Sequence, residues 1–407
     1  MNSETTRNTD AGITRSEFQF IARLSIVSVS RMFGLFMVLP VLAIWANDLV
    51  GATPVLVGIA VGGYGVTQAL LQIPYGALSD RIGRAPVVIG GLTIFVIGSL
   101  LAASATGIWG VIAGRLLQGA GAVSATLSAW LADGTRSTIR TSAMAIFGAS
   151  IGASFLLALV FGSLLSEAVG VRGLFWLSAG LGLLGIALAS PDLWRPSTPL
   201  PQRTPDVSAE RNWRRILRRE LLVLDIGVLL LHAALTAFFV LVPFALSARI
   251  GLASTEHWKL YSATLLLSLP LCVPLIARDG RRRGAAFVPA ALAMLAGGFA
   301  LLAFSGASLS AFAVGCTLFF AGFSYLEAAL PAEISRRADP DQRGASLGVF
   351  AGSQFFGAFV GGVGGGWLLT VGGADVGLLF MTGILGVWFI LGGVIGTRGD
   401  KTVHTGA

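Results

Sequence analysis

Long apolar segments alternate with short polar turns along almost the whole chain, and this alternation decides the fold class. A segment of about 20 apolar residues is long enough to cross the hydrocarbon core of a bilayer as an α-helix. The pattern predicts an all-α integral membrane protein with twelve transmembrane helices in two six-helix halves. We place the spans at residues 18–46, 54–79, 86–105, 108–132, 142–165, 172–190, 221–246, 257–277, 285–305, 308–331, 343–370 and 375–396.

The composition agrees with a membrane location. Of the 407 residues, 55% are hydrophobic and only 12% are charged, whereas soluble proteins carry about 25% charged residues. The 54 glycines are also typical of membrane helices, in which glycine is frequent. These values exclude an ordinary soluble domain.

The longest polar stretch between spans divides them into two sets of six. It covers residues 191–220 and is rich in proline and arginine, so we expect a cytoplasmic linker. Two equal sets of spans are typical of a duplicated transporter. The predicted organisation is a cytoplasmic N-terminal tail (1–17), an N-terminal half (18–190), the linker (191–220), a C-terminal half (221–396) and a cytoplasmic tail (397–407).

The basic residues predict the orientation in the membrane. Of the 28 Lys and Arg residues, only Arg172, Arg249 and Lys259 fall in the loops of one side, and Arg31 and Arg115 fall within spans. Loops rich in Lys and Arg stay in the cytoplasm. We therefore expect a multi-pass protein of the bacterial cytoplasmic (inner) membrane with both termini in the cytoplasm.

The net charge of +8 has two interpretations. A nucleic-acid partner is one, but the chain carries no nucleic-acid-binding motif. Attraction of the cytoplasmic loops to anionic lipid headgroups is the other, and it is the one we adopt. Membrane lipids are thus the expected partner of these charges, and we expect no nucleic acid and no second copy of the chain.

Polar side chains within the spans are the candidate functional residues. A central Arg or Asp costs about 2.5 to 3.5 kcal/mol on insertion scales, so such residues mark pathways or relays by default. Residues four apart, such as Tyr64, Gln68 and Gln72, share one helix face. The alternative is that these groups only join helices by hydrogen bonds. The predicted substrate cavity comprises Arg31, Tyr64, Gln68, Gln72, Gln118 and Gln354.

Acidic residues within the spans are candidates for proton coupling. Glu327 lies one turn before Pro331 in an otherwise apolar helix, where desolvation favours the protonated carboxyl group. A permanent ion pair with an arginine from another helix is the alternative. The predicted proton-coupling set comprises Glu327, Asp225, His232 and Arg115.

Asp225 and His232 have an alternative of their own. They lie seven residues apart, on one face of span 7, and a proton can pass between groups placed in this way. Because Asp225 is close to the cytoplasmic end of the span, pairing with Arg218 or Arg219 explains it equally well. Glu333 is close enough to the inner boundary of span 10 to be a helix-end residue.

The energy source follows from motifs that the chain lacks. A phosphate-binding loop ends in Gly-Lys-Ser/Thr, and the chain's two lysines, Lys259 and Lys401, lie in no such motif. Its three histidines form no metal-ligand pattern, and no nucleophile and base are paired. We therefore expect a secondary transporter that uses a proton gradient, with no cofactor and no metal, and not an enzyme.

Two further stretches carry a family resemblance. The charged turn between spans 2 and 3 reads Gly76-Ala-Leu-Ser-Asp80-Arg81-Ile-Gly83-Arg84, and span 4 contains Arg115-Leu-Leu-Gln118-Gly119-Ala-Gly121-Ala. Both resemble signatures of the major facilitator superfamily, the second in its proton-coupled members. The loop between spans 8 and 9 carries a decayed copy of the turn, Asp279-Gly-Arg-Arg-Arg-Gly284. The resemblance implies the major facilitator fold.

A narrower resemblance covers nearly the whole membrane domain. Span 1, with Arg31-Met-Phe-Gly-Leu-Phe-Met-Val-Leu-Pro40, and the stretches Glu327-Ala-Ala-Leu-Pro331 and Ser353-Gln354-Phe look like YajR-type drug-efflux members. Two features depart from that pattern. A soluble domain is expected after span 12 in YajR-type proteins but not here, and span 5 reads Gly148-Ala-Ser-Ile-Gly152 without the Gly-Pro pair usual in antiporters.

The resemblance also implies a conformational latch in the turn. Its residues are Gly76, Asp80, Arg81, Gly83, Arg84 and Asp133. Asp80 is expected to meet the N-terminus of span 11, where unpaired N–H groups and the helix dipole favour a carboxylate, and Arg84 is expected to bridge to Asp133. These contacts would tie the halves together on the cytoplasmic face and hold the outward-facing state.

The resulting functional hypothesis is drug/proton antiport, the proton-coupled export of small amphiphilic or hydrophobic compounds by alternating access. Proton-coupled uptake or exchange of a small anionic metabolite is the first alternative, with Arg31 and Arg115 as the electrostatic attractor. A membrane receptor without transport is the second.

Overall fold

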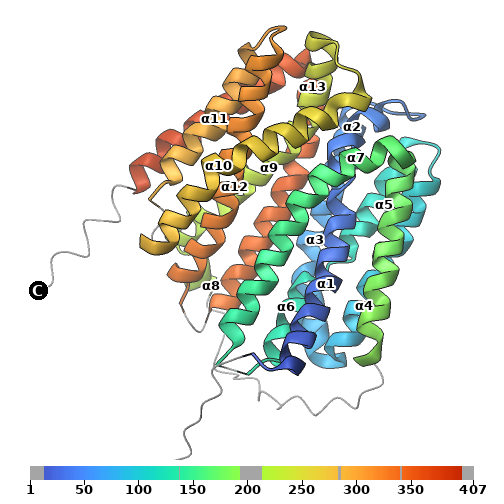
Figure 1. Cartoon of the computed structure of the whole chain (residues 1–407), viewed down its shortest axis with the longest axis vertical. Helices are drawn as coiled ribbons and strands as arrows, with labels where there is room; N and C mark the ends of the chain where they lie inside the picture. The colour runs from blue at the N-terminus through green and yellow to red at the C-terminus, as the bar shows by residue number, and fades with distance from the viewer. Residues whose placement is uncertain (1–12, 137, 193–212, 283–285, 340–341, 397–407) are drawn as a thin grey trace, which may run out of the picture.

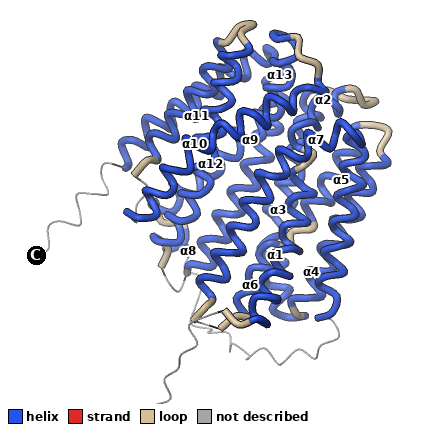
Figure 2. The backbone as a smooth tube through the Cα atoms, viewed as in Figure 1, coloured by secondary structure: helices blue, strands red, loops and turns tan. Residues whose placement is uncertain are grey.

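The computed structural model describes residues 13–136, 138–192, 213–282, 286–339 and 342–396. The two predicted tails and most of the predicted linker lie outside these ranges. Almost all of the described chain is helical (Figure 2), and its recorded β contact is one isolated bridge between Val50 and Gly107.

The N-terminal half contains seven α-helices within the described residues. They are α1 (Arg15–Phe36), α2 (Leu39–Asn47), α3 (Pro54–Ile82), α4 (Arg84–Ser104), α5 (Ile108–Ala120), α6 (Ser124–Asp133) and α7 (Arg140–Ala189), followed by a 3₁₀ turn at Ser190–Asp192.

The described C-terminal part begins with one helical turn and continues with five longer helices. They are α8 (Trp213–Ile216), α9 (Arg219–Ala245), α10 (His257–Arg282), α11 (Val288–Phe304), α12 (Leu309–Arg337) and α13 (Arg343–Gly396). A π-helical turn, Leu246–Ile250, extends α9, and a 3₁₀ turn, Ser254–Glu256, precedes α10.

Breaks in the helices explain how these elements make the predicted spans. Span 1 is interrupted before α2, where Pro40 has no N–H to bond the preceding turn, and span 4 is interrupted after Gly121. α7 and α13 each contain two spans joined at a glycine with positive φ, Gly170 and Gly373, a conformation that strains other residues.

Eight described helical segments are long and apolar enough to cross a membrane, and α7 and α13 each count as one of these eight segments. The two spans in each of these, together with the interrupted α5–α6 and the shorter α11, complete the predicted set. The all-α membrane fold with two sets of six spans is therefore confirmed.

The two halves lie side by side, the N-terminal one in blue and green and the C-terminal one in yellow to red (Figure 1). α3 and the first span of α13 join them through small residues. A Cβ atom added to Gly58 would lie 2.0 Å from the carbonyl oxygen of Gly362, and one added to Gly62 would lie 2.5 Å from that of Ala358. Such close approach of helices is what glycine at an interface permits.

The halves part toward the end of the bundle that carries the α3–α4 turn, which we call the hairpin end. α6 and α8 lie at this end, at the bottom of Figure 1, and α2 lies at the opposite end. At Gly76 of α3 and at Gly344 and Gly348 of α13, an added Cβ would meet no described atom within 4 Å. Within the described residues, the close contacts between α3 and α13 thus lie toward the opposite end, and space is left beside these three glycines at the hairpin end.

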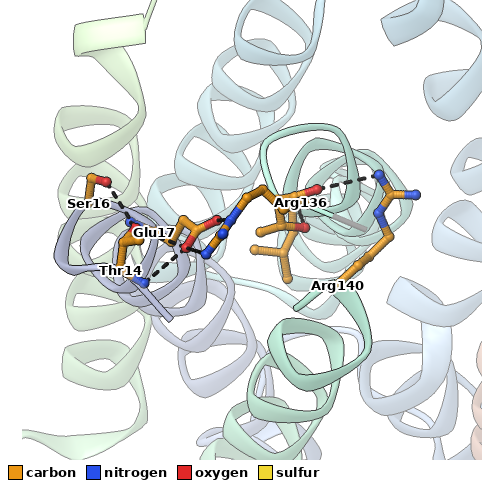
Figure 3. Close-up of polar contacts among 7 residues, drawn as sticks. Thr14, Ser16, Glu17, Arg136 and Arg140 are labelled. Atoms are coloured by element: carbon orange, nitrogen blue, oxygen red, sulfur yellow. Dashed lines mark hydrogen bonds and ion pairs between the residues drawn. The ribbon is translucent and has the colours of Figure 1, made fainter. Parts of the chain in front are cut away.

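Ion pairs fasten neighbouring helices of one half at the hairpin end. The carboxylate of Glu17, in the first turn of α1, accepts two hydrogen bonds from Arg136, at 2.6 and 2.9 Å (Figure 3). Thr14 caps α1 and forms a capping box with Glu17. In the C-terminal half Arg218, before α9, pairs with Asp339, after α12, at 3.5 Å.

Candidate functional site

The polar side chains inside the spans fall into separate groups, and the first surrounds Arg115 of α5. Its guanidinium stacks on the ring of Tyr64 at 4.6 Å and donates to Gln118 Oε1 at 2.8 Å. It also donates to three main-chain carbonyl oxygens, those of Leu35, Ala60 and Val61, at 3.2, 3.2 and 3.3 Å. Arg115 is fully buried and joins α1, α3 and α5, so its visible role is to hold these helices together.

Arg31 of α1 forms the second group in the same half. It is also buried, and it donates to Gln68 Oε1 at 2.9 Å and to Ser124 Oγ at 3.3 Å. Ser124 is the first residue of α6, directly after the break in span 4. Neither Arg31 nor Arg115 has a recorded ion pair with any residue that the structure describes.

Glu327 of α12 lies at the centre of the third group, in the C-terminal half. Gln354 of α13 donates from Nε2 to Glu327 Oε1 at 3.1 Å, and His232 Nε2 of α9 lies 3.5 Å from Glu327 Oε2. A third of the Glu327 side chain remains exposed. The predicted alternative, an arginine partner from another helix, is not what the described residues provide.

The hydrogen bonds define how this group handles a proton. His232 Nδ1 lies 3.1 Å from the carbonyl oxygen of Val228, a pure acceptor, so Nδ1 carries the ring proton of the neutral imidazole. Nε2 is then free to accept from Gln354 at 2.8 Å. Glu327 Oε2 lies 3.5 Å from the same nitrogen, so a proton can pass between the two side chains when Gln354 releases Nε2.

Asp225 lies two turns before His232 in α9 and is buried. Its Oδ1 has no recorded hydrogen-bond partner among the described residues. The predicted alternative placed it beside Arg218 or Arg219, but Arg218 pairs with Asp339 instead. Asp225 is thus a buried carboxylate on the helix that also carries His232, without a direct bond between them.

Aromatic side chains connect the groups of the two halves, and apart from Tyr64 they were not among the residues predicted from the sequence. Phe155 of α7 contacts Phe36 of α1 at 4.9 Å and Phe323 of α12 at 5.8 Å between ring centroids. Phe36 also contacts Tyr64, and Phe323 contacts His232. In the sequence, a phenylalanine within an apolar helix cannot be told from an ordinary core residue. The four-residue spacing of Phe323 and Glu327, which places both on one helix face, was the available signal.

The predicted cavity residues are mostly internal to the N-terminal half. Arg31, Tyr64, Gln68, Gln72 and Gln118 are all buried in this conformation, and Gln354 is the partly exposed member of the set. Gln118 of this set binds Arg115 of the predicted proton-coupling set, and Gln354 binds Glu327 of that set.

The charged turn forms part of the expected latch. Arg84 donates from Nε to Asp133 Oδ2 at 2.9 Å, as predicted, and from NH1 to Ser79 Oγ at 2.6 Å. Gly83 has a φ of 98°, which favours glycine, while Arg81 is exposed and Gly76 faces open space.

The predicted position of Asp80 at the start of span 11 differs from what this conformation shows. Asp80 pairs with Arg84 at 2.6 Å and is 63% exposed. A Cβ added to Gly344, near the start of α13, would meet no described atom within 4 Å, so this conformation leaves space beside the helix start instead of an Asp80 contact. The latch of the closed state therefore remains a prediction.

The second copy of the turn behaves differently. Asp279 of α10 is buried, accepts from the N–H of Ala286 at 3.2 Å and accepts a hydrogen bond from the hydroxyl of Tyr325 in α12. It thus fastens α10 to α12 within one half.

Comparison with known proteins identifies relatives of the whole membrane domain. Residues 24–267 match the sequence profile of the Major Facilitator Superfamily. Inner membrane transport protein YajR of Escherichia coli (strain K12) is 40% identical over 361 residues, which are 88% of this chain and 79% of that protein. Tetracycline resistance protein, class C, of Escherichia coli is 28% identical over 344 residues, 78% of this chain and 81% of that protein.

A solved structure shows the same architecture. The human organic anion transporter MFSD10 superimposes with a TM-score of 0.67 and covers 93% of this chain and 100% of its own. The sequence identity is 18%, so this likeness concerns the fold alone.

Proposed function

Because the chain belongs to the major facilitator superfamily and is a multi-pass transporter, we propose that it exports small amphiphilic or hydrophobic compounds in exchange for protons. The observation that carries the proposal is the Glu327 group. A carboxyl group deep in the membrane domain has an amide and an imidazole as partners, and part of its surface is exposed. Intramembrane acids in such settings serve as proton carriers.

The mechanism follows from the charge of Glu327. Ionised Glu327 retains an uncompensated negative charge inside the membrane domain, whereas proton binding removes this charge and its desolvation cost. Protonation therefore stabilises whichever arrangement of the halves covers the carboxyl group best. A substrate that occupies the same region when Glu327 is ionised is then exchanged for the proton.

The proposed direction, export, rests on the orientation of the chain in the membrane and on the names of two similar proteins. We place the hairpin end and both termini in the cytoplasm of a bacterium, so the structure corresponds to the inward-facing state. The name of the class C tetracycline resistance protein supports export of a drug-like compound. YajR, which is 40% identical, is named an inner membrane protein, and this supports the same membrane here.

The proposal is tested with everted membrane vesicles from a pump-deficient bacterial host, in which an exporter loads the lumen. The wild-type chain should load ethidium when the lumen is acidified, and nigericin should stop it by collapsing the proton gradient. Glu327→Gln, which keeps the shape but cannot ionise, should reduce loading to the level measured with nigericin.

The matched control is Glu333→Gln on the same helix. Glu333 pairs with Arg336 and Arg337 at the end of α12, as expected for a helix-end residue. Its substitution by Gln should therefore leave gradient-driven loading of ethidium intact. Unchanged rate and pH profile in Glu327→Gln would show that Glu327 is not the coupling residue.

One observation favours the alternative function, proton-coupled uptake or exchange of a small anion. Arg31 is a buried cation without a recorded carboxylate partner among the described residues. In right-side-out vesicles this alternative predicts accumulation of an organic anion when the outside is acidified, whereas the export function predicts none.

A further inference from the structure

Four charged residues of the spans are segregated by sign between the two halves. Arg31 and Arg115 lie in the N-terminal half and form no recorded ion pair with the described residues. Asp225 and Glu327 lie in the C-terminal half, and neither is paired with an arginine of the described chain. Because an unpaired charge in a membrane interior is costly, this separation calls for a ligand that satisfies both sides.

The positive side has unused hydrogen-bond donors around Arg31. Arg31 Nε and Gln68 Nε2 are buried and have no recorded partner, although the two side chains bond each other through other atoms. α6 is ten residues long, and its N-terminus beside Arg31 has no side-chain cap. Free N–H groups and the helix dipole at such an end favour an anion, as does the guanidinium.

One edge of this corner is partly exposed. Ser124, which accepts from Arg31, and the next residue, Ala125, are both partly exposed. Gln72 lies one turn beyond Gln68 on α3 toward the open hairpin end, and its Oε1 has no recorded partner. The corner therefore combines cationic and amide donors with an edge open to solvent.

The negative side is Glu327, which is partly exposed, accepts a hydrogen bond from Gln354 and lies 3.5 Å from His232 Nε2. An aromatic layer lies between the two sides. Phe36 is on α1 with Arg31, Phe323 is one turn before Glu327 on α12, and Phe155 contacts both rings.

The negative and positive sides belong to one region. A continuous series of ring contacts leads from Tyr64 through Phe36 and Phe155 to Phe323 of the other half, one turn before Glu327. Tyr64 lies one turn before Gln68, the side chain that binds Arg31. A single small molecule placed between the halves therefore lies near both charges.

From this arrangement we infer that the transported compound is a zwitterion with an aromatic middle. Its anionic group binds Arg31, Gln68 and the N-terminus of α6, its rings pack against Phe36, Phe155 and Phe323, and its ammonium group binds Glu327. The inference rests on the proposed function and explains the exchange. The ammonium group and the proton compete for one carboxylate, so binding of the substrate releases a proton to the side that is open, while the anionic group leaves the proton balance unchanged.

The test uses four probes built on one scaffold. An aminomethyl-biphenyl-carboxylic acid is the zwitterion, its methyl ester is the cation, its N-acetyl derivative is the anion, and the N-acetyl ester is neutral. Binding to the purified full-length protein is measured by calorimetry in buffers of different ionisation enthalpy, which also counts released protons. The zwitterion should bind about tenfold more tightly than the cation or the anion, the effect of one added charge-assisted contact.

Variants separate the two charged contacts. Arg31→Gln should lower the affinity for the zwitterion to that of the cation and leave the cation's own affinity within about twofold. Arg31→Lys, which keeps the charge, should restore part of the preference and provides the test if Arg31→Gln does not fold. Arg23→Gln is the matched control, because Arg23 lies on the same helix but pairs with Asp192 at 2.5 Å, and it should change nothing.

Three results would overturn the inference: equal binding of cation and zwitterion by the wild type, equal weakening of both probes in Arg31→Gln, or no binding of the zwitterion by folded protein. The vesicle assay keeps this outcome separate from the proposed function. If ethidium loading still requires Glu327 while the zwitterion is not preferred, only the substrate class is wrong. If loading does not require Glu327, proton-coupled export by this residue is wrong as well.

Discussion

Arg115 and Glu327 are both charged residues within a span, where a charge is costly, yet their surroundings differ. Arg115 has its donors engaged by carbonyl oxygens and by Gln118, and it is completely buried. Glu327 retains exposed surface and has partners that can share a proton with it. At the scale of the residue, satisfied hydrogen bonds indicate a structural role, and a carboxyl group near an imidazole acceptor indicates proton transfer.

This difference predicts the effect of removing the Arg115 guanidinium. Arg115→Gln should lower the free energy of unfolding by about 2 to 3 kcal/mol, because several buried hydrogen bonds between α1, α3 and α5 are lost. The apparent Tm of the purified protein reports the change. Arg81→Gln, at an exposed position of the turn, should stay within about 0.5 kcal/mol of the wild type. A normal Tm of Arg115→Gln together with lost proton coupling would support the predicted coupling role instead.

At the scale of the element, two adjacent glycines of α13 contact different helices, one within the C-terminal half and one across the halves. A Cβ at Gly361 would lie 2.0 Å from the carbonyl oxygen of Ala233 in α9, within the C-terminal half. A Cβ at Gly362 would lie 2.4 Å from the carbonyl oxygen of Gly58 in α3, across the halves. The first contact belongs to the stability of one half and the second to the closure of the end opposite the hairpin.

Adding a methyl group, by substitution with Ala, should therefore have different effects at Gly361 and at Gly362. Gly361→Ala should destabilise the C-terminal half by about 1 to 3 kcal/mol through overpacking and lower the apparent Tm. Gly362→Ala should instead push α3 and α13 apart and favour the state that is open at the opposite end. Labelling of a cysteine introduced at Val55 should rise in Gly362→Ala and not in Gly361→Ala; the reverse pattern would mean that the assignment of these interfaces is wrong.

At the scale of the whole molecule, the register of α3 and α13 predicts the alternate state. Gly58 meets Gly362, Gly62 meets Ala358 and Gly65 meets Phe355, so the antiparallel register places Gly76 opposite Gly344. Both positions have open space here. A rocking motion that closes the hairpin end would bring them together.

A cysteine pair tests this motion. Gly76→Cys with Gly344→Cys, with the buried Cys272 and Cys316 replaced by Ala, should form a disulfide when substrate and a proton gradient drive turnover. The disulfide should stop transport, and reduction should restore it. Gly76→Cys alone is the control. Absence of cross-linking during active transport would contradict this register in the closed state.

The latch prediction concerns the same closed state. Asp80→Asn should slow transport and leave membrane insertion unchanged, because the amide cannot offer a negative charge to the N-terminus of α13. Transport rate and the amount of inserted protein are measured together. Asp48→Asn, the same substitution at an exposed position after α2 at the opposite end, is the matched control, and normal turnover of Asp80→Asn would refute the latch.

The sequence determined the fold class and the positions of the spans, and its resemblance to a known family also implied the contact of Arg84 with Asp133. These features were readable because a membrane span must satisfy its own backbone and therefore appears as a continuous apolar segment. Only the tertiary structure decided that Gln354 binds Glu327 beside His232, that Gln68 and Ser124 bind Arg31, and that Phe155 connects the halves. Those choices depend on which faces of distant helices pack together, and the same apolar pattern is compatible with many packings.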